Sequence, residues 1–280
     1  MPTRKRDEGW SYAKKTGHKN EELVKELLDT DISYAYSFLQ RLNLVNDRIV
    51  HTEIGGLHEP KVNSVMGGKK NSKTDLKIFT TQCQLNVSIK KSFGGQVYLI
   101  GAQDFIDLFE YHFHKHVPCS VQRAIKLFWA QDAEALTIID TYSESKYGKS
   151  FDLQRKHKSL NATTLHAFNL DLYNDILDWF SQNIYEITKL SFSLGAASAP
   201  SDWAEFIWYI NMLGEHNVDA IFLIEDLCNA SKAVAYNEVF FGTKNGGTTI
   251  QLPFGSVQWH QRKLEFRHSY DKISSLIRPL

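Results

Sequence analysis

Residues 72–92, SKTDLKIFTTQCQLNVSIKKS, place an aspartate before one strand-like run and a lysine pair at the end of the next. Side chains alternate between the two faces of a strand, so Ser88 and Lys90 share the polar face of the second run. Pairing of the two runs would bring Asp75 alongside them. A carboxylate is a hard ligand suited to Mg²⁺, and an ammonium can orient a water and offset charge in a phosphoryl transition state. The pattern therefore predicts a phosphodiester hydrolysis site, and a surface hairpin with a solvated pair, Lys90 and Lys91, is the alternative.

The same stretch resembles the active-site signature of the PD-(D/E)xK nuclease superfamily. That signature is an aspartate at the start of one strand, followed on the next strand by an acidic residue, any residue and a lysine. Thr74-Asp75 matches the first half and Ser88-Ile89-Lys90 the second, with serine in the place of the acidic residue, as in some type II restriction endonucleases. The resemblance implies a Mg²⁺ site, in which Mn²⁺ substitutes, formed by Asp75, the Ile89 carbonyl and one further acid.

A glutamate on the first helix is the candidate for that further acid. The stretch TGHKNEELV resembles the part of these enzymes in which a glutamate on the first core helix points into the active site, and Glu21 fits best. The resemblance thus adds Glu21 to Asp75, Ser88 and Lys90 as a catalytic residue and as a metal ligand. The alternative is that Glu21 and Glu22 are solvated charges near a helix N-terminus, which favours acids.

Two longer stretches resemble type II restriction endonucleases with a Ser-x-Lys motif. They are KKSFGGQVYLIGAQDFIDLFE after the lysine and GGTTIQLPFGSVQWHQRKLEFRH near the C-terminus, whereas residues 120–235 resemble nothing that we can name. The resemblance implies a sequence-specific endonuclease that cuts double-stranded DNA to 5′-phosphate and 3′-hydroxyl ends, accompanied in the cell by a cognate DNA methyltransferase. A homodimer is expected, since two-fold symmetric proteins match palindromic sites. A structure-specific repair or junction nuclease and a catalytically silent DNA-binding module are the alternatives.

A DNA-cutting enzyme needs contacts to phosphates for position and to bases for sequence choice. The glycine- and lysine-rich stretch 67–73 suits phosphates because glycines allow close backbone approach, although a solvated loop is equally compatible with it. Arg, Asn and Gln are the side chains that pair with guanine and adenine edges. The predicted DNA-binding residues are Lys69, Lys70, Lys73, Lys91, Asn245, Gln258, His260, Arg262 and Arg267.

Other chemical patterns are weaker. The stretch YHFHKHVPC at 111–119 has ligand types that suit zinc. On a helix His114 would point away from His112 and His116, and on a strand the three would align, but the preceding FIDLFE has a helical period, so a helix end is the preferred interpretation. The aromatic residues at 203–209 are more typical of a core or a dimer interface than of stacking on bases. Phosphate-loop, dinucleotide-binding, serine-hydrolase and zincin motifs are absent from the sequence.

The elements that must position these residues predict a mixed α/β fold, a restriction-endonuclease-like core with a central mixed β-sheet flanked by helices. We expect helices at 18–29, 31–42, 163–190 and 201–215, and helical structure at 102–140 that is interrupted at Val117-Pro118. Strands are expected at 75–80, 84–91, 96–101 and 218–225, with Gly94-Gly95 suited to a hairpin turn between 84–91 and 96–101, and antiparallel strands are expected within 238–268. Loops are expected at 43–74 and a surface excursion at 141–160. One nuclease domain is expected over 1–280, with a catalytic core at 7–140, a helical middle at 141–216 and DNA-contacting strands at 217–280.

Cysteine content and hydropathy bear on the compartment. The three cysteines are far apart, a pattern typical of free thiols in a reducing cytoplasm. The sequence contains no apolar run long enough to span a membrane. The net charge is zero, with a basic excess in residues 1–91 and an acidic excess after it, which is only a hint of a nucleic-acid partner.

Overall fold

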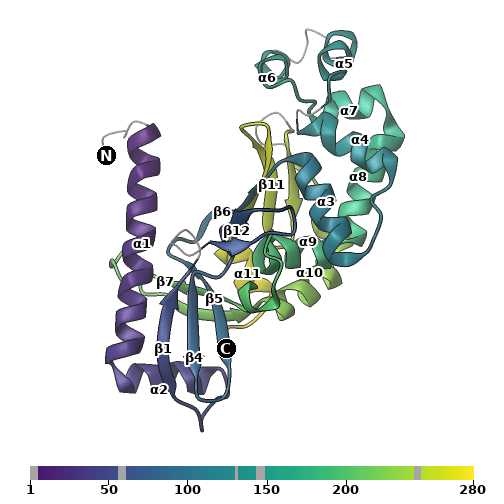
Figure 1. Cartoon of the computed structure of the whole chain (residues 1–280). Helices are drawn as coiled ribbons and strands as arrows, with labels where there is room; N and C mark the ends of the chain where they lie inside the picture. The colour runs from purple at the N-terminus through teal and green to yellow at the C-terminus, as the bar shows by residue number, and fades with distance from the viewer. Residues whose placement is uncertain (1–5, 56–60, 130–131, 143–148, 243–246) are drawn as a thin grey trace. The chain divides into compact units, whose positions relative to one another are not determined.

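The structure, a computed structural model of the chain, describes residues 6–55, 61–129, 132–142, 149–242 and 247–280, with side chains from Lys15 onward except at 149–150. The chain forms two compact units (Figure 1). Unit 1 comprises Met1–Phe93, Phe192–Ile224 and Arg278–Leu280, and unit 2 comprises Gly94–Ser191 and Glu225–Ile277. Within the described part of the chain, no helix has the length and apolar character needed to cross a membrane.

Unit 1 is built around a five-stranded sheet in the order β1-β4-β5-β7-β8. β5 and β7 are parallel, and the other neighbours are antiparallel. The elements of this unit are α1 (Arg6–Thr30), α2 (Ile32–Arg41), β1 (Ile49–Ile54), β2 (Val62–Asn63), β3 (Lys69–Lys70), β4 (Leu76–Thr80), β5 (Gln84–Lys90), a 3₁₀ turn (Pro200–Asp202), β7 (Phe206–Ile210) and β8 (Asp219–Leu223).

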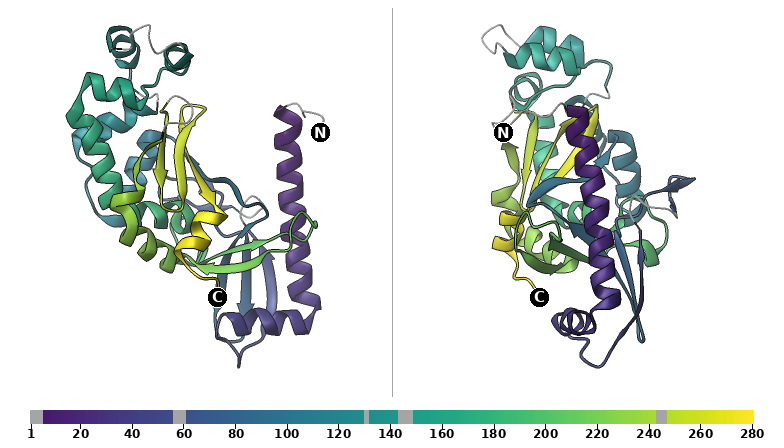
Figure 2. Two further views of the ribbon diagram at one scale, coloured as in Figure 1. Left: turned by 180° about the vertical axis from the view of Figure 1, so that it is seen from behind. Right: turned by 90° about the vertical axis from the view of Figure 1, so that its left-hand side faces the viewer.

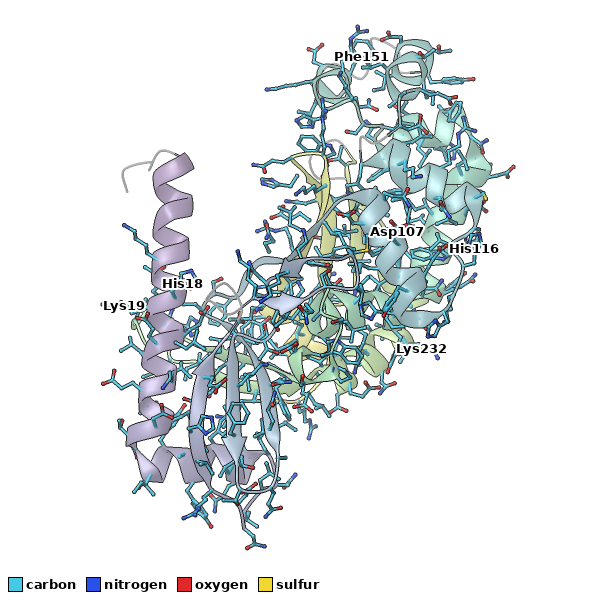
Figure 3. The ribbon with its side chains drawn as sticks, in the orientation of Figure 1. His18, Lys19, Asp107, His116, Phe151 and Lys232 are labelled. Carbon is cyan, nitrogen blue, oxygen red and sulfur yellow. The ribbon has the colours of Figure 1, made fainter. Side chains whose placement is uncertain are left out.

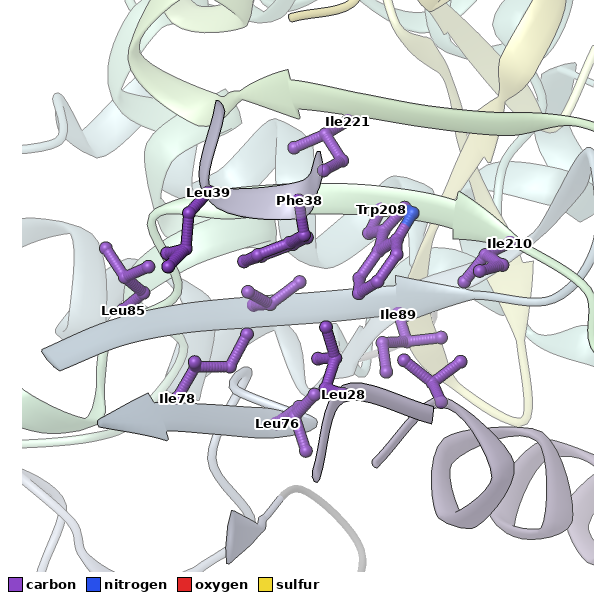
Figure 4. Packing of buried hydrophobic residues seen from close by; sticks show 12 residues of the cluster. Leu28, Phe38, Leu39, Leu76, Ile78, Leu85, Ile89, Trp208, Ile210 and Ile221 are labelled. Atoms are coloured by element: carbon purple, nitrogen blue, oxygen red, sulfur yellow. The ribbon is translucent and has the colours of Figure 1, made fainter. Parts of the chain in front are cut away.

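One face of this sheet is covered by the two N-terminal helices. Leu76 and Ile78 of β4 and the alternate residues of β5 pack with Leu28 of α1 and Phe38 of α2 in one buried cluster (Figure 4). The Trp208 ring of β7 lies 4.9 Å from the Phe38 ring. α2 begins after Asp31, whose carboxylate accepts the backbone N–H of Tyr34 as a helix cap. Burial of this apolar face holds α1 along the sheet, where it can present its polar residues.

Unit 2 combines helices with an antiparallel sheet in the order β6-β12-β11-β10-β9. Strands β10 to β12 run side by side in both views of Figure 2. Its elements are β6 (Gly94–Ile100), α3 (Ala102–Phe113), α4 (Cys119–Phe128), α5 (Ala135–Tyr142), α6 (Lys149–His157), α7 (Ala162–Phe168), α8 (Leu170–Gln182), α9 (Ile184–Lys189), β9 (Phe240–Gly242), β10 (Thr249–Leu252), β11 (Gly255–His260), β12 (Lys263–Ser269) and α11 (Tyr270–Leu276). A π-helical turn (Leu190–Leu194) and α10 (Ile224–Glu238) connect the units along the chain.

The apolar face of the unit 2 sheet packs on its helices. The Phe266 ring of β12 lies 5.5 Å from Phe105 of α3, and the Phe241 ring of β9 lies 4.7 Å from Tyr173 of α8. Gly255 allows β11 and β12 to approach closely, because a Cβ atom there would lie 2.0 Å from the Arg267 carbonyl oxygen. The other face of the sheet carries polar residues, among them Gln251, Gln258 and Glu265.

The predicted mixed α/β fold with a central mixed sheet flanked by helices is confirmed. Strands are confirmed in the predicted stretches 75–80, 84–91, 96–101 and 218–225, and α2 in 31–42. The predicted burial of the aromatic group at 203–209 is confirmed for Trp208 and Tyr209.

Several boundaries were wrong. α1 continues through Gly17 instead of starting near His18, and the expected loop at 43–74 contains β1. The expected surface excursion at 141–160 contains α6 and the buried residues Gln154 and Leu160. The expected helix at 163–190 is interrupted at Asn169 and Asn183, of which Asn169 caps α8 by accepting a backbone N–H.

The largest error concerns residues 201–215, which were expected to be helical. They hold β7, whose sequence FIWYI has strand-forming side chains buried on both faces, as is usual beside a parallel neighbour. A hairpin between 84–91 and 96–101 was also wrong, since β6 pairs with β12. The expectation of one nuclease domain remains a prediction.

Candidate active site

The pairing of β4 with β5 places Asp75 opposite Ser88. Leu76 pairs with Val87, and the Asp75 N–H donates to the Val87 carbonyl oxygen at 2.9 Å. Because the strands are antiparallel, Asp75, which precedes Leu76, lies opposite Ser88, which follows Val87. The Ser88 hydroxyl donates to Asp75 Oδ2 at 3.0 Å, and the Ile89 N–H donates to the same oxygen at 2.8 Å. The apolar residues of β5 face the helices, as predicted, which leaves Ser88 on the polar face.

Lys90 completes this arrangement at the end of β5. Its ammonium donates to Ser88 Oγ at 2.6 Å and to the Ile89 carbonyl oxygen at 3.2 Å, and it lies 3.5 Å from Asp75 Oδ2. The side chains of Lys90 and Asp75 are only 15% and 18% exposed. The Ser88 hydroxyl accepts from the ammonium and donates to the carboxylate, so a neutral group links the two charges. These bonds hold the Asp75 carboxylate and the Lys90 ammonium close together and restrict the movement of both side chains.

Helix α1 brings a second carboxylate to this point. Buried Asn20 fixes α1 against the end of β7, because its amide donates to the Ile210 carbonyl oxygen at 3.1 Å and accepts the Met212 N–H at 2.7 Å. Glu21 follows directly. Burial, together with the negative charge of Asp75, raises the pKa of Glu21 to about 8, against the opposing effect of the Lys90 ammonium. Glu21 is therefore within electrostatic reach of both charged residues on the strands.

His18 stands one turn before Glu21 on the same helix. Its Nδ1 lies 3.5 Å from Glu21 Oε2, and both side chains are less than one-fifth exposed. His18 and Lys19 lie on opposite sides of α1 in Figure 3. The sequence interpretation missed His18 and Asn20. Their spacing of three and one residues before Glu21 was visible, but the direction in which α1 faces depends on its packing.

Lys73 joins the site from the segment before β4. Burial and the nearby Lys90 ammonium lower its pKa well below the ordinary lysine value, with Asp75 acting in the opposite direction. Its stem lies on Gly195, where an added Cβ atom would come within 3.0 Å of Lys73 Cε. Ser72 Oγ donates to the Asp202 carbonyl oxygen at 2.6 Å and steadies this segment. Lys73 was predicted only as a DNA-binding residue of a loop, and the structure places it beside Asp75 and Lys90.

The oxygen atoms at this site suit a hard divalent cation. Asp75 and Glu21 supply carboxylates and Ile89 a main-chain carbonyl, the ligand types that Mg²⁺ takes in proteins. The mutual repulsion that contributes to the raised Glu21 pKa is what a bound cation relieves. These residues therefore fit Mg²⁺.

No described group of three or more His, Cys, Asp and Glu side chains has the arrangement of a metal site. A cation at the candidate site would accordingly be bound by two side chains, Asp75 and Glu21, and by the main-chain carbonyl of Ile89. The same finding applies to the described residues at 112–119, where a zinc site was the weaker interpretation. His114 instead ends α3 in the left-handed region at φ 52°, and His116 pairs with Glu110 at 2.8 Å. The preferred interpretation of a helix end is confirmed there.

The predicted phosphate contacts of unit 1 differ in accessibility. Lys69 and Lys70 are exposed on β3, in a hairpin whose turn has Gly67 at φ +83° and Gly68 at φ +66°. The Lys91 ammonium lies 3.0 Å from each carboxylate oxygen of Glu215. Lys69 and Lys70 are thus exposed to solvent, whereas Lys91 is already held by an ion pair.

The predicted base contacts lie on the C-terminal strands of unit 2. Gln258, His260 and Arg267 surround the carboxylate of Glu265, and Arg262 lies in the turn between β11 and β12. Asn245 lies outside the described residues. Glu265 was missed, because a single acid among basic residues carries no signal until the strands are paired.

Comparison with known proteins finds similarity in structure but not in sequence. No protein-family model matches the chain, and no curated protein sequence matches it. A crystal structure of restriction endonuclease MspI in complex with its cognate DNA superposes with a TM-score of 0.46 and 12% identity, covering 88% of this chain and 83% of that one. A similarity of this degree does not establish a shared activity.

Proposed function

We propose that this chain is a Mg²⁺-dependent endonuclease that hydrolyses double-stranded DNA at specific sequences and leaves 5′-phosphate and 3′-hydroxyl ends. The observation that carries the proposal is the Asp75–Ser88–Lys90 linkage, joined electrostatically by Glu21. Paired carboxylates with an oriented ammonium match the needs of phosphodiester hydrolysis, in which a water attacks and negative charge accumulates. The core would be of the restriction-endonuclease type, and the chain would act as a cytoplasmic homodimer beside a cognate methyltransferase.

Each side chain has a part in the reaction. The Lys90 ammonium orients the attacking water and offsets charge on the phosphoryl group, while Ser88 holds that ammonium in place. Lys73 contacts the scissile phosphate from the side of Gly195. Mg²⁺, or Mn²⁺ in its place, would be held by Asp75, Glu21 and the Ile89 carbonyl, and when bound it supplies a Lewis acid.

The serine at position 88 has a consequence for the cation. A hydroxyl is a weaker Mg²⁺ ligand than a carboxylate. The site therefore has one fewer negative charge than the Asp-Glu-Lys version of the signature, and we expect weaker binding of the cation. Ser88→Glu should raise the apparent affinity for Mg²⁺, because it restores that negative charge.

The test is cleavage of unmethylated phage DNA with Mg²⁺, with EDTA, and by the Lys90→Ala variant. Discrete fragments that disappear in EDTA and in Lys90→Ala are expected. Lys25→Ala is the matched control, since it removes a half-buried lysine that pairs with Asp29 on α1. Fragments that persist in Lys90→Ala would place the chemistry elsewhere. Intact DNA that is still bound by the wild-type protein would indicate a silent binding module, and cutting confined to branched or damaged DNA would indicate a structure-specific nuclease.

A further inference from the structure

The polar side of the unit 2 sheet carries an organised set of side chains. Directly paired residues of neighbouring strands share a face. The pairs Gln258–Glu265, Ser256–Arg267 and Gln251–Ser256 therefore place these side chains together, and Gln96 of β6 pairs with Arg267. We call this set the amide face: Gln96, Gln251, Ser256, Gln258, Glu265 and Arg267.

A nearly buried carboxylate lies at the centre of the amide face. The Glu265 side chain is 6% exposed, and its two oxygens accept from different neighbours. Gln258 Nε2 donates to Oε2 at 2.6 Å, and Arg267 Nη1 donates to Oε1 at 3.0 Å. Glu265 therefore fixes both the Gln258 amide and the Arg267 guanidinium in one orientation.

The donors and acceptors of Gln258 and Arg267 that do not bond Glu265 match the hydrogen-bonding edges of bases. Gln258 uses one N–H for Glu265 and retains its carbonyl oxygen and a second N–H, the donor–acceptor pair that recognises adenine. Arg267 retains further N–H groups of its planar fork, which recognise the two acceptors of guanine. The Arg267 side chain is 40% exposed, so its head reaches solvent although one nitrogen is bound.

A purely structural role explains this arrangement less well. A buried carboxylate costs desolvation energy, and packed apolar residues would stabilise a sheet at least as well. The adjoining two-residue turn also departs from the residues that favour such turns. Gln261 and Arg262 have φ of +50° and +60°, the left-handed conformation in which Asn and Gly are usual. Polar and basic side chains thus occupy this end of the hairpin at a cost in stability.

We propose that the amide face reads base edges of duplex DNA, with Arg267 selecting a guanine, Gln258 selecting an adenine, and Glu265 acting as a positioning residue for both. This inference rests on the proposed function, since it assigns the sequence choice of that enzyme. The DNA sequence that the protein prefers accordingly contains a guanine and an adenine at fixed positions. Removing either side chain relaxes the preference at its own position and leaves the others unchanged.

The test is selection of bound duplexes from a randomised DNA pool without cleavage, in Ca²⁺, by the wild type and by variants. The wild type is expected to enrich one motif. Arg267→Lys keeps the charge and loses the planar fork, so we expect its guanine preference to fall by roughly 10- to 100-fold while non-specific binding persists. Gln258→Ala should relax one adenine position, and Glu265→Gln should relax both positions.

Matched controls come from unit 2. Arg123→Ala removes an exposed arginine of α4 that pairs with Glu134, and Gln103→Ala removes a glutamine of α3 that bonds Asp107. Neither should change the motif. An unchanged motif in Arg267→Lys and Gln258→Ala overturns the inference, as does a uniform loss of affinity at every position.

Parallel digestion of phage DNA in Mg²⁺ distinguishes this failure from failure of the proposed function. Wild-type cleavage together with unchanged variant motifs refutes only the roles of the amide face. A wild type that enriches no motif refutes those roles too, and the digestion then shows whether a nuclease activity remains.

Discussion

Replacing Glu21 by glutamine should stabilise the metal-free protein, and more so as the pH rises. Glu21 has its pKa raised from 4.5 to about 8, so the folded state keeps a proton that the unfolded chain has lost. Below pH 4.5 both states hold the proton and the group has little effect on stability. Between pH 4.5 and 8 the folded protein loses stability relative to the unfolded chain, because the carboxyl ionises in the unfolded chain while burial and Asp75 keep Glu21 protonated in the folded state. Glutamine has no charge to bury.

The size of the effect follows from the two pKa values. One pKa unit corresponds to about 1.4 kcal/mol of free energy. Glu21→Gln should therefore raise the free energy of unfolding by about 4 kcal/mol at pH 8 and by less than about 1 kcal/mol at pH 5. Mg²⁺ should stabilise the wild type at pH 8 and the variant much less, because the variant has lost one of the proposed ligands.

The assay is urea denaturation followed by tryptophan fluorescence, in EDTA and in Mg²⁺, at pH 5, 6.5 and 8. Glu26→Gln is the matched control, since Glu26 is an exposed acid of the same helix. A gain that is the same at pH 5 and pH 8 would refute the reasoning, as would a gain no larger than that of Glu26→Gln. Either result would mean that Glu21 is solvated and distant from Asp75.

Three further predictions concern stability and thiol reactivity. Asn20→Ala should lower the free energy of unfolding by about 2–4 kcal/mol in a denaturation experiment, because it leaves the buried Ile210 carbonyl and the Met212 N–H without their amide partner. The double variant Gln261→Asn with Arg262→Gly should raise it by about 1–2 kcal/mol, since Asn and Gly adopt positive φ at little cost; an unchanged melting temperature would argue against strain in this turn. Burial raises the pKa of the Cys228 thiol to about 12, so native protein should react with Ellman's reagent quickly at its two exposed cysteines and slowly at Cys228, and three equally fast thiols would contradict this.

The central part of the candidate site was visible in the sequence because it depends on local pattern. Alternation of side chains along 84–90 is a property of any strand, and it placed Ser88 and Lys90 on one face before any fold was known. Asp75 immediately precedes the neighbouring strand of a hairpin, so its position opposite Ser88 could also be predicted from the sequence. The mixed α/β class followed from helix-like and strand-like runs in the same way.

Segments far apart in the chain could not be joined by such reasoning. β7 lies more than 100 residues after β5, and its aromatic run was misread as helical because burial on both faces removes the alternation that marks a strand. The orientation of α1, and with it Glu21 and His18, depends on the bonds from Asn20 to Ile210 and Met212.

The two interpretations that depend most on folding concern Lys73 and Glu265. In the sequence, Lys73 is one of several lysines of a polar loop, and only the folded chain packs its stem against Gly195. In the sequence, Glu265 is a single acid among basic residues, and only the pairing of β11 with β12 lets it accept hydrogen bonds from Gln258 and Arg267. Residue spacing thus specifies the Asp75–Ser88–Lys90 linkage, because strand geometry is local. Burial and long-range pairing specify the charges that surround it and the partners of Glu265, because both arise only when distant segments pack.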